Sequence, residues 1–145
     1  MIRSPGSRYH SPNTRILLIT PPPLDEPAWE KTCLSKGKTL DRNAETTYSY
    51  AIGCVEVAEE LNIPVVNLWR LVDDSIVEEE RELCEFLVDG LHLSALGNAV
   101  LAKGILAKIN AVWPEIYPEN MEMILPWWGD VDPSDPAKSL IFPDH

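Results

Sequence analysis

Two continuous apolar runs constrain the fold of this chain more than any other feature of its sequence. The first, Ile16 to Thr20, ends at three consecutive prolines, and the second, Ile63 to Leu68, is interrupted by Pro64 and Asn67. Apolar runs without alternating polar residues are typical of strands buried on both faces of a parallel sheet. Two such strands cannot cover themselves, so we expect neighbouring strands that these segments do not supply.

Amphipathic helical patterns alternate with the predicted strands. Asn43 can cap a helix whose apolar residues recur three or four apart as far as Leu61, and Ser94 can cap a second long helix that ends at Pro114. Residues 24–42 predict an irregular loop, the segment after Leu68 a single helical turn, and residues 74–87 a short helix or loop. Strand, helix, strand, helix predicts an α/β layer architecture with parallel strands.

The two ends of the sequence show no regular period. Residues 1–14 are rich in Pro, Gly and Ser, a composition that predicts a flexible arm. We assign residues 15–145 to the C-terminal part of a single domain. From residue 115 onwards its tail contains five prolines and the Trp127-Trp128 pair, and we expect that tail to wrap over the domain in an ordered form.

Charge and hydropathy narrow the classes of partner. The chain has 23 acidic and 12 basic residues, and its formal net charge of −11 repels phosphate backbones, so we expect no nucleic-acid partner. Its unbroken apolar runs are far shorter than the roughly 20 residues that a membrane-spanning helix needs. No apolar segment follows Met1 to direct secretion. We therefore expect a cytoplasmic protein without a membrane span.

The three cysteines do not form a recognisable pattern. Cys33, Cys54 and Cys84 lie far apart, without a Cys-x-x-Cys pair or a histidine at metal-ligand spacing. This spacing predicts three reduced thiols. It indicates neither a disulfide framework nor a metal site.

The residues most informative about chemistry lie just before the second long helix. Asp89 precedes His92 by three residues in the segment Asp-Gly-Leu-His-Leu-Ser. A carboxylate bonded to one ring nitrogen of His92 would fix the imidazole tautomer and leave the other nitrogen as a general base. The same spacing also occurs in ordinary turns ahead of a capped helix, so spacing alone leaves a purely structural interpretation open.

The context of this pair resembles the last conserved block of the SGNH (GDSL) hydrolases, in which Asp and His complete a Ser-His-Asp triad. The resemblance is closest to the isoamyl-acetate-hydrolysing esterase branch and covers residues 15 to about 140. The segments that carry it are ILLITPPPLDEPAWEK, LDRNAETTYSYA, PVVNLWRLV, DGLHLS and LPWWGDVDPSDPAKSL.

This resemblance implies both a fold and an activity. The fold is a three-layer α/β/α sandwich with a parallel sheet of flavodoxin-like topology, of which this chain would hold the last two strands and the helices around them. The activity is hydrolysis of small carboxylic esters such as acetates, with Asp89 and His92 as catalytic residues and with no metal or organic cofactor.

The blocks that carry the family's nucleophile and oxyanion donors do not occur in this sequence. It contains neither Gly-Asp-Ser nor Gly-x-Asn-Asp. Ser7 follows Gly6 in the Pro-rich arm with no strand before it, and Asn98 falls on the predicted helix, so we expect neither to substitute. The resemblance places the absent blocks upstream of Ile16. We therefore expect Met1 to be an internal methionine of a longer protein and the chain alone to be inactive.

Trp29 is the third candidate site residue. It follows the first predicted strand, where parallel sheets place their ligands, and we predict that it lines a pocket for the acyl or alcohol part of an ester. Two alternatives stay open. The chain could be a catalytically inactive α/β binding or regulatory module, or an unrelated α/β binding domain in which Asp89 and His92 form only a helix-entry turn.

Overall fold

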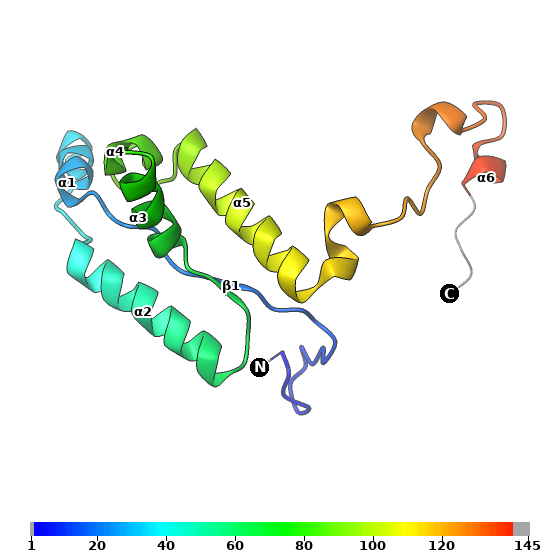
Figure 1. Ribbon diagram of the computed structural model, residues 1–145, viewed down its shortest axis with the longest axis horizontal. Helices are drawn as coiled ribbons and strands as arrows, with labels where there is room; N and C mark the ends of the chain where they lie inside the picture. Colours follow the sequence, from blue (N-terminus) through cyan, green and yellow to red (C-terminus); the bar gives the residue numbers. More distant parts are fainter. Residues whose placement is uncertain (1, 141–145) are drawn as a thin grey trace.

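Two short parallel strands lie between the helices of this protein. In the computed structural model, which describes residues 2–140, β1 (Leu18–Ile19) pairs with β2 (Val65–Val66) with Leu18 opposite Val65 (Figure 1). Both strands fall inside the predicted apolar runs, and their parallel pairing confirms the α/β character. The described residues form a two-stranded sheet, so the complete three-layer sandwich stays a prediction.

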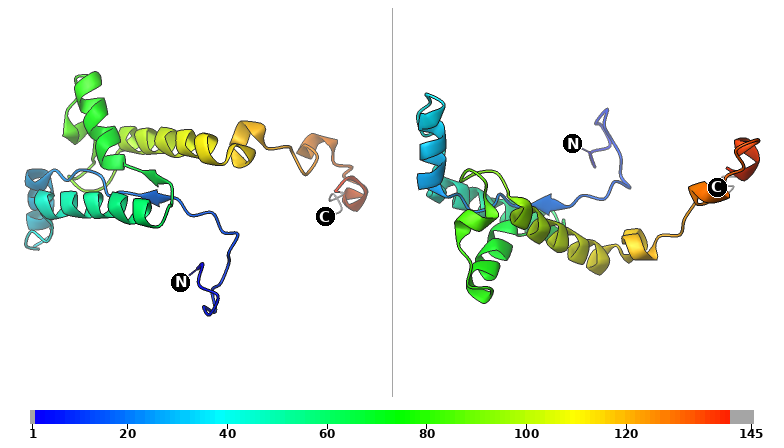
Figure 2. Two further views of the ribbon diagram at one scale, coloured as in Figure 1. Left: turned by 60° about the horizontal axis from the view of Figure 1, so that its bottom comes forward. Right: turned by 90° about the horizontal axis from the view of Figure 1, so that it is seen from above.

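Helices make up most of the remaining structure. Helix α2 packs on β1 and α5 packs on β2, and the views show the strands between these two helices (Figures 1 and 2). The elements are α1 (Glu26–Ser35), α2 (Ala44–Glu60), α3 (Leu68–Glu78), α4 (Leu83–Phe86), α5 (Ala95–Val112) and α6 (Pro136–Ser139), with short 3-10 turns η1 (Pro114–Ile116), η2 (Pro118–Asn120) and η3 (Trp128–Asp130).

Side-chain caps begin the two long helices where the sequence predicted them. The Asn43 side chain accepts a hydrogen bond from Thr46 N at 2.7 Å, and the Ser94 hydroxyl accepts one from Gly97 N at 3.2 Å. Asn67 caps α3 in the same way. Helix α3 continues for 11 residues where the sequence predicted one turn, because its apolar stripe is buried against its neighbours.

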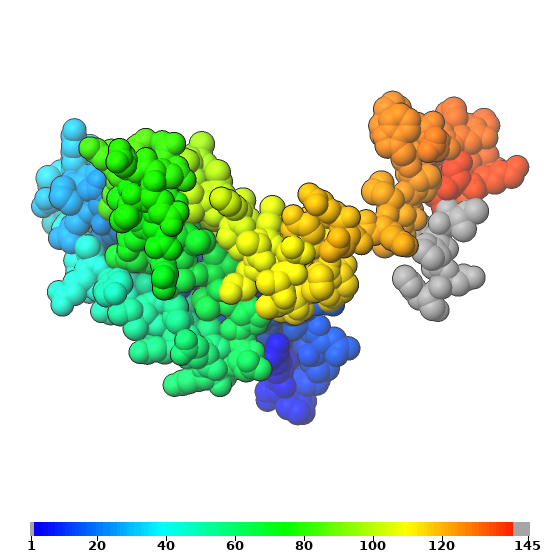
Figure 3. All heavy atoms as spheres, in the orientation of Figure 1, coloured from blue at the N-terminus to red at the C-terminus, as the bar shows by residue number. Residues whose placement is uncertain are grey.

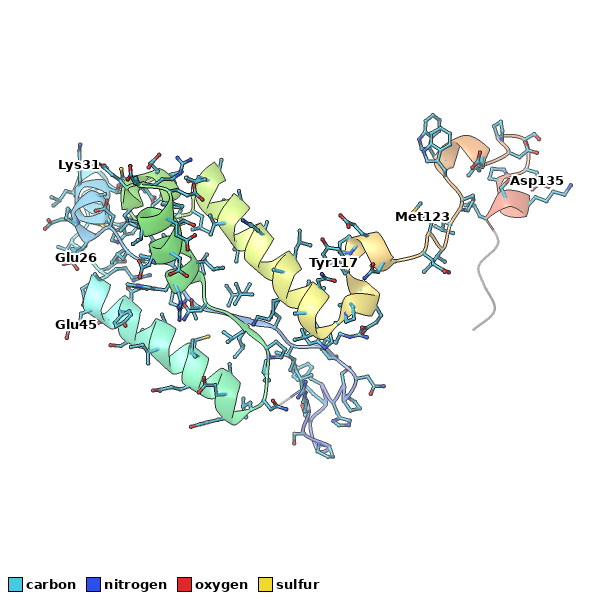
Figure 4. The ribbon with its side chains drawn as sticks, viewed as in Figure 1. Glu26, Lys31, Glu45, Tyr117, Met123 and Asp135 are labelled. Carbon is cyan, nitrogen blue, oxygen red and sulfur yellow. The ribbon has the colours of Figure 1, made fainter. Side chains whose placement is uncertain are left out.

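Helix α1 occupies a segment that the sequence predicted to be an irregular loop. The Asp25 side chain accepts a hydrogen bond from Ala28 N at 3.1 Å, and Pro27 lies in the first turn, where its missing N–H has no intrahelical partner to lose. The prediction was wrong because it took Pro27 as a helix breaker. Figure 4 shows Glu26 close to the start of α2, where its carboxylate accepts a hydrogen bond from Ala44 N at 2.8 Å.

The best-packed part of the core lies where α3, α4 and α5 meet. Leu68, Val72 and Phe86 are all almost completely buried there. Helix α5 can approach α4 closely because Gly97 has no side chain, since a Cβ at that position would lie 2.3 Å from the Phe86 carbonyl oxygen. The loop between α4 and α5, which begins directly after Phe86, is therefore held against the core where it starts.

One edge of β1 is not paired with another strand of the described residues. Leu18 N and Thr20 N donate to β2, so the backbone groups of Ile19 face the other way, and its carbonyl accepts a weak hydrogen bond from the Cys54 thiol at 3.7 Å. Ile19 is 40% exposed. The prediction of burial on both faces is wrong for this residue, because no further strand within residues 2–140 pairs with β1 on that side.

The tail departs from its predicted course. Its first part, η1, packs on α5, and Arg15 forms an ion pair with Glu115. Beyond this point the chain leads away from the body, and Trp128 is 78% exposed (Figures 1 and 3). The prediction of an ordered wrap is wrong for the described residues, because prolines and short 3-10 turns keep this segment extended instead of folding it back.

Helix α5 is the one helix of residues 2–140 that is long and apolar enough to cross a membrane, by length and composition alone. Core helices of other proteins meet the same two criteria. Helix α5 contacts α3, α4 and β2, and it carries Lys103 and Lys108. The expectation of no membrane span stays a prediction.

The unpaired edge of β1 predicts self-association. Exposed, apolar strand edges promote association between chains, and a lysine on such an edge opposes it. We expect Ile19→Lys to raise the monomer fraction measured by size-exclusion chromatography with light scattering at two protein concentrations. Val77→Lys places the same charge on the exposed face of α3 and should leave that fraction unchanged. Equal association of the original chain and both variants would contradict the prediction.

Candidate active site

The loop between α4 and α5 is a tight hairpin. Leu87 and Leu93 form an antiparallel bridge, Val88 N donates to the His92 carbonyl at 2.8 Å, and Ser94 N donates to the Phe86 carbonyl at 2.8 Å. Its base is therefore tied to the buried core residue Phe86. The backbone bonds leave Asp89 to Leu91 at the tip, close to His92.

Asp89 binds His92 through both its carboxylate oxygens. Its Oδ2 lies 2.8 Å from His92 Nδ1, and its Oδ1 accepts hydrogen bonds from His92 N at 2.9 Å and Leu91 N at 3.1 Å. The predicted contact between the two side chains is confirmed. Because Nδ1 is engaged by Asp89, Nε2 is the ring nitrogen left to exchange a proton with another group.

The hydrogen bonds to Asp89 keep its carboxyl group ionised. Partial burial by itself would raise the pKa of Asp89, but the backbone N–H and ring of His92, with the Leu91 N–H, outweigh that effect and lower the pKa to about 2. An ionised Asp89 favours the tautomer of His92 that carries its proton on Nδ1. It would also stabilise an imidazolium formed when Nε2 takes up a proton.

The two side chains differ in their access to solvent. The Asp89 side chain is 22% exposed, whereas that of His92 is 65% exposed. The carboxylate is thus held in the loop while most of the imidazole is accessible. This arrangement can act as a general base toward a group brought to Nε2, and the catalytic role of both residues stays a prediction.

Helix α1 supports the loop from behind. Asp25 N donates to the Gly90 carbonyl at 3.0 Å, and the Thr32 hydroxyl donates to the Asp89 carbonyl at 3.2 Å. Gly90 has a positive φ of 93°, and a Cβ there would lie 2.5 Å from Trp29 N. Only a glycine fits so close to α1.

Trp29, which belongs to α1, packs against the ring of His92. The residue is 9% exposed, in a cluster with Leu24 and Cys33, and its ring centroid lies 5.9 Å from that of His92 with the planes at 74°. Its indole N–H donates to Asp41 Oδ1 at 2.9 Å. The predicted substrate-lining role of Trp29 stays a prediction.

Sequence reasoning missed the supporting residues Asp25, Thr32 and Asp41. Asp25 carries a usable signal, because an Asp two residues before a proline matches the start of a helix. Nothing in the local sequence indicates that Thr32 contacts Asp89 or that Asp41 contacts Trp29. Those bonds depend on how α1 packs against a loop that follows it by more than fifty residues.

An open, mainly apolar groove of about 650 Å³ adjoins the hairpin. The tip residue Leu91 forms part of its wall, together with residues that follow β1, precede α2 or lie in the first half of α2: Pro21, Asp41, Arg42, Asn43, Thr46, Thr47, Tyr50 and Cys54. No cluster of three or more His, Cys, Asp or Glu side chains suited to a metal ion is found within residues 2–140. Cys33, Cys54 and Cys84 are free thiols.

Comparison with known proteins identifies relatives of the chain. It is 35% identical over 130 residues to the isoamyl acetate-hydrolyzing esterase 1 homolog of Mus musculus and 36% identical over 132 residues to that of Homo sapiens, in each case over 90% of this chain. A GDSL esterase/lipase of Arabidopsis thaliana is 38% identical over 131 residues, or 89% of this chain. No family model matches the chain.

These relatives are all named as ester hydrolases, the class to which an accessible histidine paired with a carboxylate is suited. Within that class, the chain is related to the SGNH/GDSL hydrolases, and the predicted resemblance is confirmed. The alignments cover 49% of the mouse protein, 48% of the human protein and 52% of the Arabidopsis protein. The chain thus spans about half the length of the curated relatives that it matches.

Because Gly90 lies so close to α1, we expect a methyl group at this position to lower the free energy of unfolding more than at an ordinary glycine. Gly90→Ala should destabilise the fold by about 1–2 kcal/mol through its positive φ and by a further amount of about 1–3 kcal/mol through overpacking. Gly37→Ala is the matched control, because Gly37 also has a positive φ but has open space around its Cβ position. Chemical denaturation measures both; equal losses would contradict the close approach.

The ionised state of Asp89 predicts a pH dependence of stability. Its folded-state pKa of about 2 lies below the ordinary value, so its contribution is present above about pH 4 and is lost as the pH falls through about 2. Asp89→Asn keeps an acceptor but does not ionise. The variant should therefore lose less unfolding free energy than the original chain when the pH falls from 6 to 2, by about 1 kcal/mol. The difference is small because solvent screens the group. Urea unfolding between pH 2 and 6 tests this, with Asp130→Asn in the exposed tail as control. Parallel curves for Asp89→Asn and the original chain would contradict it.

Proposed function

We propose that this chain contributes the acid-base half of a serine ester hydrolase that acts on small carboxylic esters. The observation that carries the proposal is the 2.8 Å contact between Asp89 Oδ2 and His92 Nδ1 in a chain related to GDSL-type esterases. Asp89 orients the imidazole, and His92 exchanges the proton. The serine that completes the triad lies outside residues 1–145.

Each residue has a defined part in this chemistry. A serine hydroxyl brought to Nε2 of His92 loses its proton to the imidazole as its oxygen attacks the ester carbonyl. The ionised Asp89 stabilises the resulting imidazolium. His92 then returns the proton to the departing alkoxide, and a water molecule activated by the same nitrogen releases the acid from the acyl-enzyme. No metal ion takes part in this scheme.

Three observations support a serine from outside this sequence. The sequence contains no Gly-Asp-Ser segment, and the alignments cover only about half of each relative. Ser7, which follows a glycine, belongs to the N-terminal arm at the end of the body remote from α1 and α4 (Figure 1). In addition, the unpaired edge of β1 leaves room for a further strand beside the groove.

The groove beside Leu91 supports a small, largely apolar substrate. Its volume of about 650 Å³ is that of a ligand pocket, and its walls are mainly apolar. An ester of a short acid and a short alcohol has one polar group and needs few hydrogen bonds. The mouse and human relatives are named as homologs of an isoamyl acetate-hydrolyzing esterase, which agrees with this class of substrate.

A second candidate function follows from the same absence of a nucleophile. A chain that acts without a serine-bearing partner segment would be a catalytically inactive α/β binding or regulatory module. In that case the groove would bind a small apolar molecule without turnover. The two functions differ in whether ester hydrolysis appears when upstream coding sequence is restored.

The deciding experiment compares hydrolysis of p-nitrophenyl acetate by four proteins. These are the 145-residue chain, the chain extended with its upstream coding sequence, and the His92→Ala variant of each. We expect no turnover by the short chain above that of its His92→Ala variant. We expect turnover by the extended chain, lowered on the order of 10⁴-fold by His92→Ala.

Two controls make the result specific to the site. His10→Ala in the extended chain removes a histidine from the N-terminal arm and should leave turnover unchanged. Asp89→Ala should reduce it strongly. An extended chain indifferent to His92→Ala would exclude the triad assignment, and robust turnover by the short chain would exclude a nucleophile outside residues 1–145.

A further inference from the structure

Most of the His92 ring surface lies in solvent, so few contacts limit its motion. Asp89 holds Nδ1, which determines where the proton lies, but one hydrogen bond leaves the ring free to tilt about it. Trp29 contacts the His92 ring from the buried side. The planes of the two rings lie at 74°, an edge-to-face arrangement that aromatic pairs prefer. The ring orientation therefore depends on Trp29 staying in place.

We propose that Trp29 is a positioning residue for His92 and that Asp41 holds Trp29 in this position. The inference rests on the proposed function of His92, whose Nε2 must face the reacting group for proton transfer. Trp29 does not touch the reacting atoms in this scheme. It restricts the imidazole to the orientation in which Asp89 can bind Nδ1.

The bond to Asp41 is what fixes the indole ring. The indole N–H of Trp29 is the only hydrogen-bond donor of that side chain. It donates to the carboxylate of Asp41, and such a bond is stronger than one to a neutral acceptor. That bond also lowers the pKa of the exposed Asp41, with a smaller contribution from Arg42. The Trp29 backbone is fixed in the first turn of α1, where its amide N–H donates to the Asp25 carbonyl at 2.9 Å.

These contacts favour positioning over substrate lining for Trp29. A ring that is 9% exposed, and whose donor is already bound to Asp41, has little surface and no polar group to offer an ester. Asp41 itself lies in the wall of the groove beside Leu91. A change at Asp41 can therefore reach His92 through Trp29 without removing any contact of His92 itself.

The test measures the tautomer of His92 in the full 145-residue chain by long-range ¹H–¹⁵N correlation at a pH where imidazoles are neutral. In the original chain we expect the proton on Nδ1. In Trp29→Leu and Asp41→Ala we expect the ratio of the Nδ1–H to the Nε2–H form to fall roughly two- to tenfold, the size of effect typical of an aromatic pair. Trp29→Phe, which keeps a ring, and Asp41→Asn, which keeps an acceptor, should restore most of it.

Trp69→Leu is the matched control. Trp69 is also partly buried and also pairs with an aromatic ring, that of Tyr48 at 5.0 Å between centroids, and its replacement should leave the His92 signals unchanged. Dispersion of the amide signals reports whether each variant is folded. If Trp29→Leu unfolds the chain, Asp41→Ala decides alone, because Asp41 is exposed.

An unchanged tautomer ratio in folded Trp29→Leu and Asp41→Ala overturns the inference. An equal fall in Trp69→Leu also overturns it, because the effect would then be general loosening. The measurement needs no ester and no nucleophile. A shifted tautomer in a protein whose extended form lacks esterase activity would therefore refute the proposed function and leave the positioning role standing.

Discussion

Gly90 and the first turn of α1 approach each other so closely that a single methyl group would not fit between them. The Gly90 carbonyl accepts the Asp25 N–H, and the neighbouring Asp89 carbonyl accepts the Thr32 hydroxyl, so two consecutive carbonyls at the hairpin tip are bound to α1 and its N-cap. The position of the hairpin tip relative to α1 and Trp29 depends on this contact. It sets where Asp89 lies, and through Asp89 and Trp29 it sets the orientation of His92.

The same hairpin is tied at its base to the hydrophobic core. Ser94 N donates to the carbonyl of the fully buried Phe86, and Gly97 lets α5 pack directly on that carbonyl. A chain segment that is fixed at both its base and its tip retains little conformational freedom. The packing of α3, α4 and α5 thus holds the base of the loop that carries Asp89 and His92.

The sequence predicts what is encoded locally. Asn43 and Ser94 cap the helices that follow them, and Asp89 binds His92, because in each case the partners lie three residues apart and their backbone geometry is set by the turn itself. Helix α1 was missed because Pro27 has opposite meanings inside a helix and at its start. The burial of Ile19 was predicted too high because burial depends on what lies across the strand edge.

The supporting contacts of the site were beyond local reasoning for a related physical reason. Thr32 and Trp29 meet the hairpin only once α1 has packed, and the acceptor for Trp29 comes from a connection with no regular structure. Short motifs indicate what a site can do chemically. The partners that hold it in shape are distributed along the chain, and their pairing appears only in three dimensions.

Under the proposed function, the hairpin has a consequence for how a nucleophile-bearing segment would bind to this chain. Asp89 and His92 are oriented by bonds within their own loop and by α1, so the base is preformed before any nucleophile arrives. A nucleophile-bearing segment would then meet a rigid partner, and association would cost mainly the translational and rotational freedom of two bodies. Tethering that segment to this chain would remove most of this cost. The linker would set the effective concentration of the nucleophile at the site, and it would not change the geometry of Asp89 and His92.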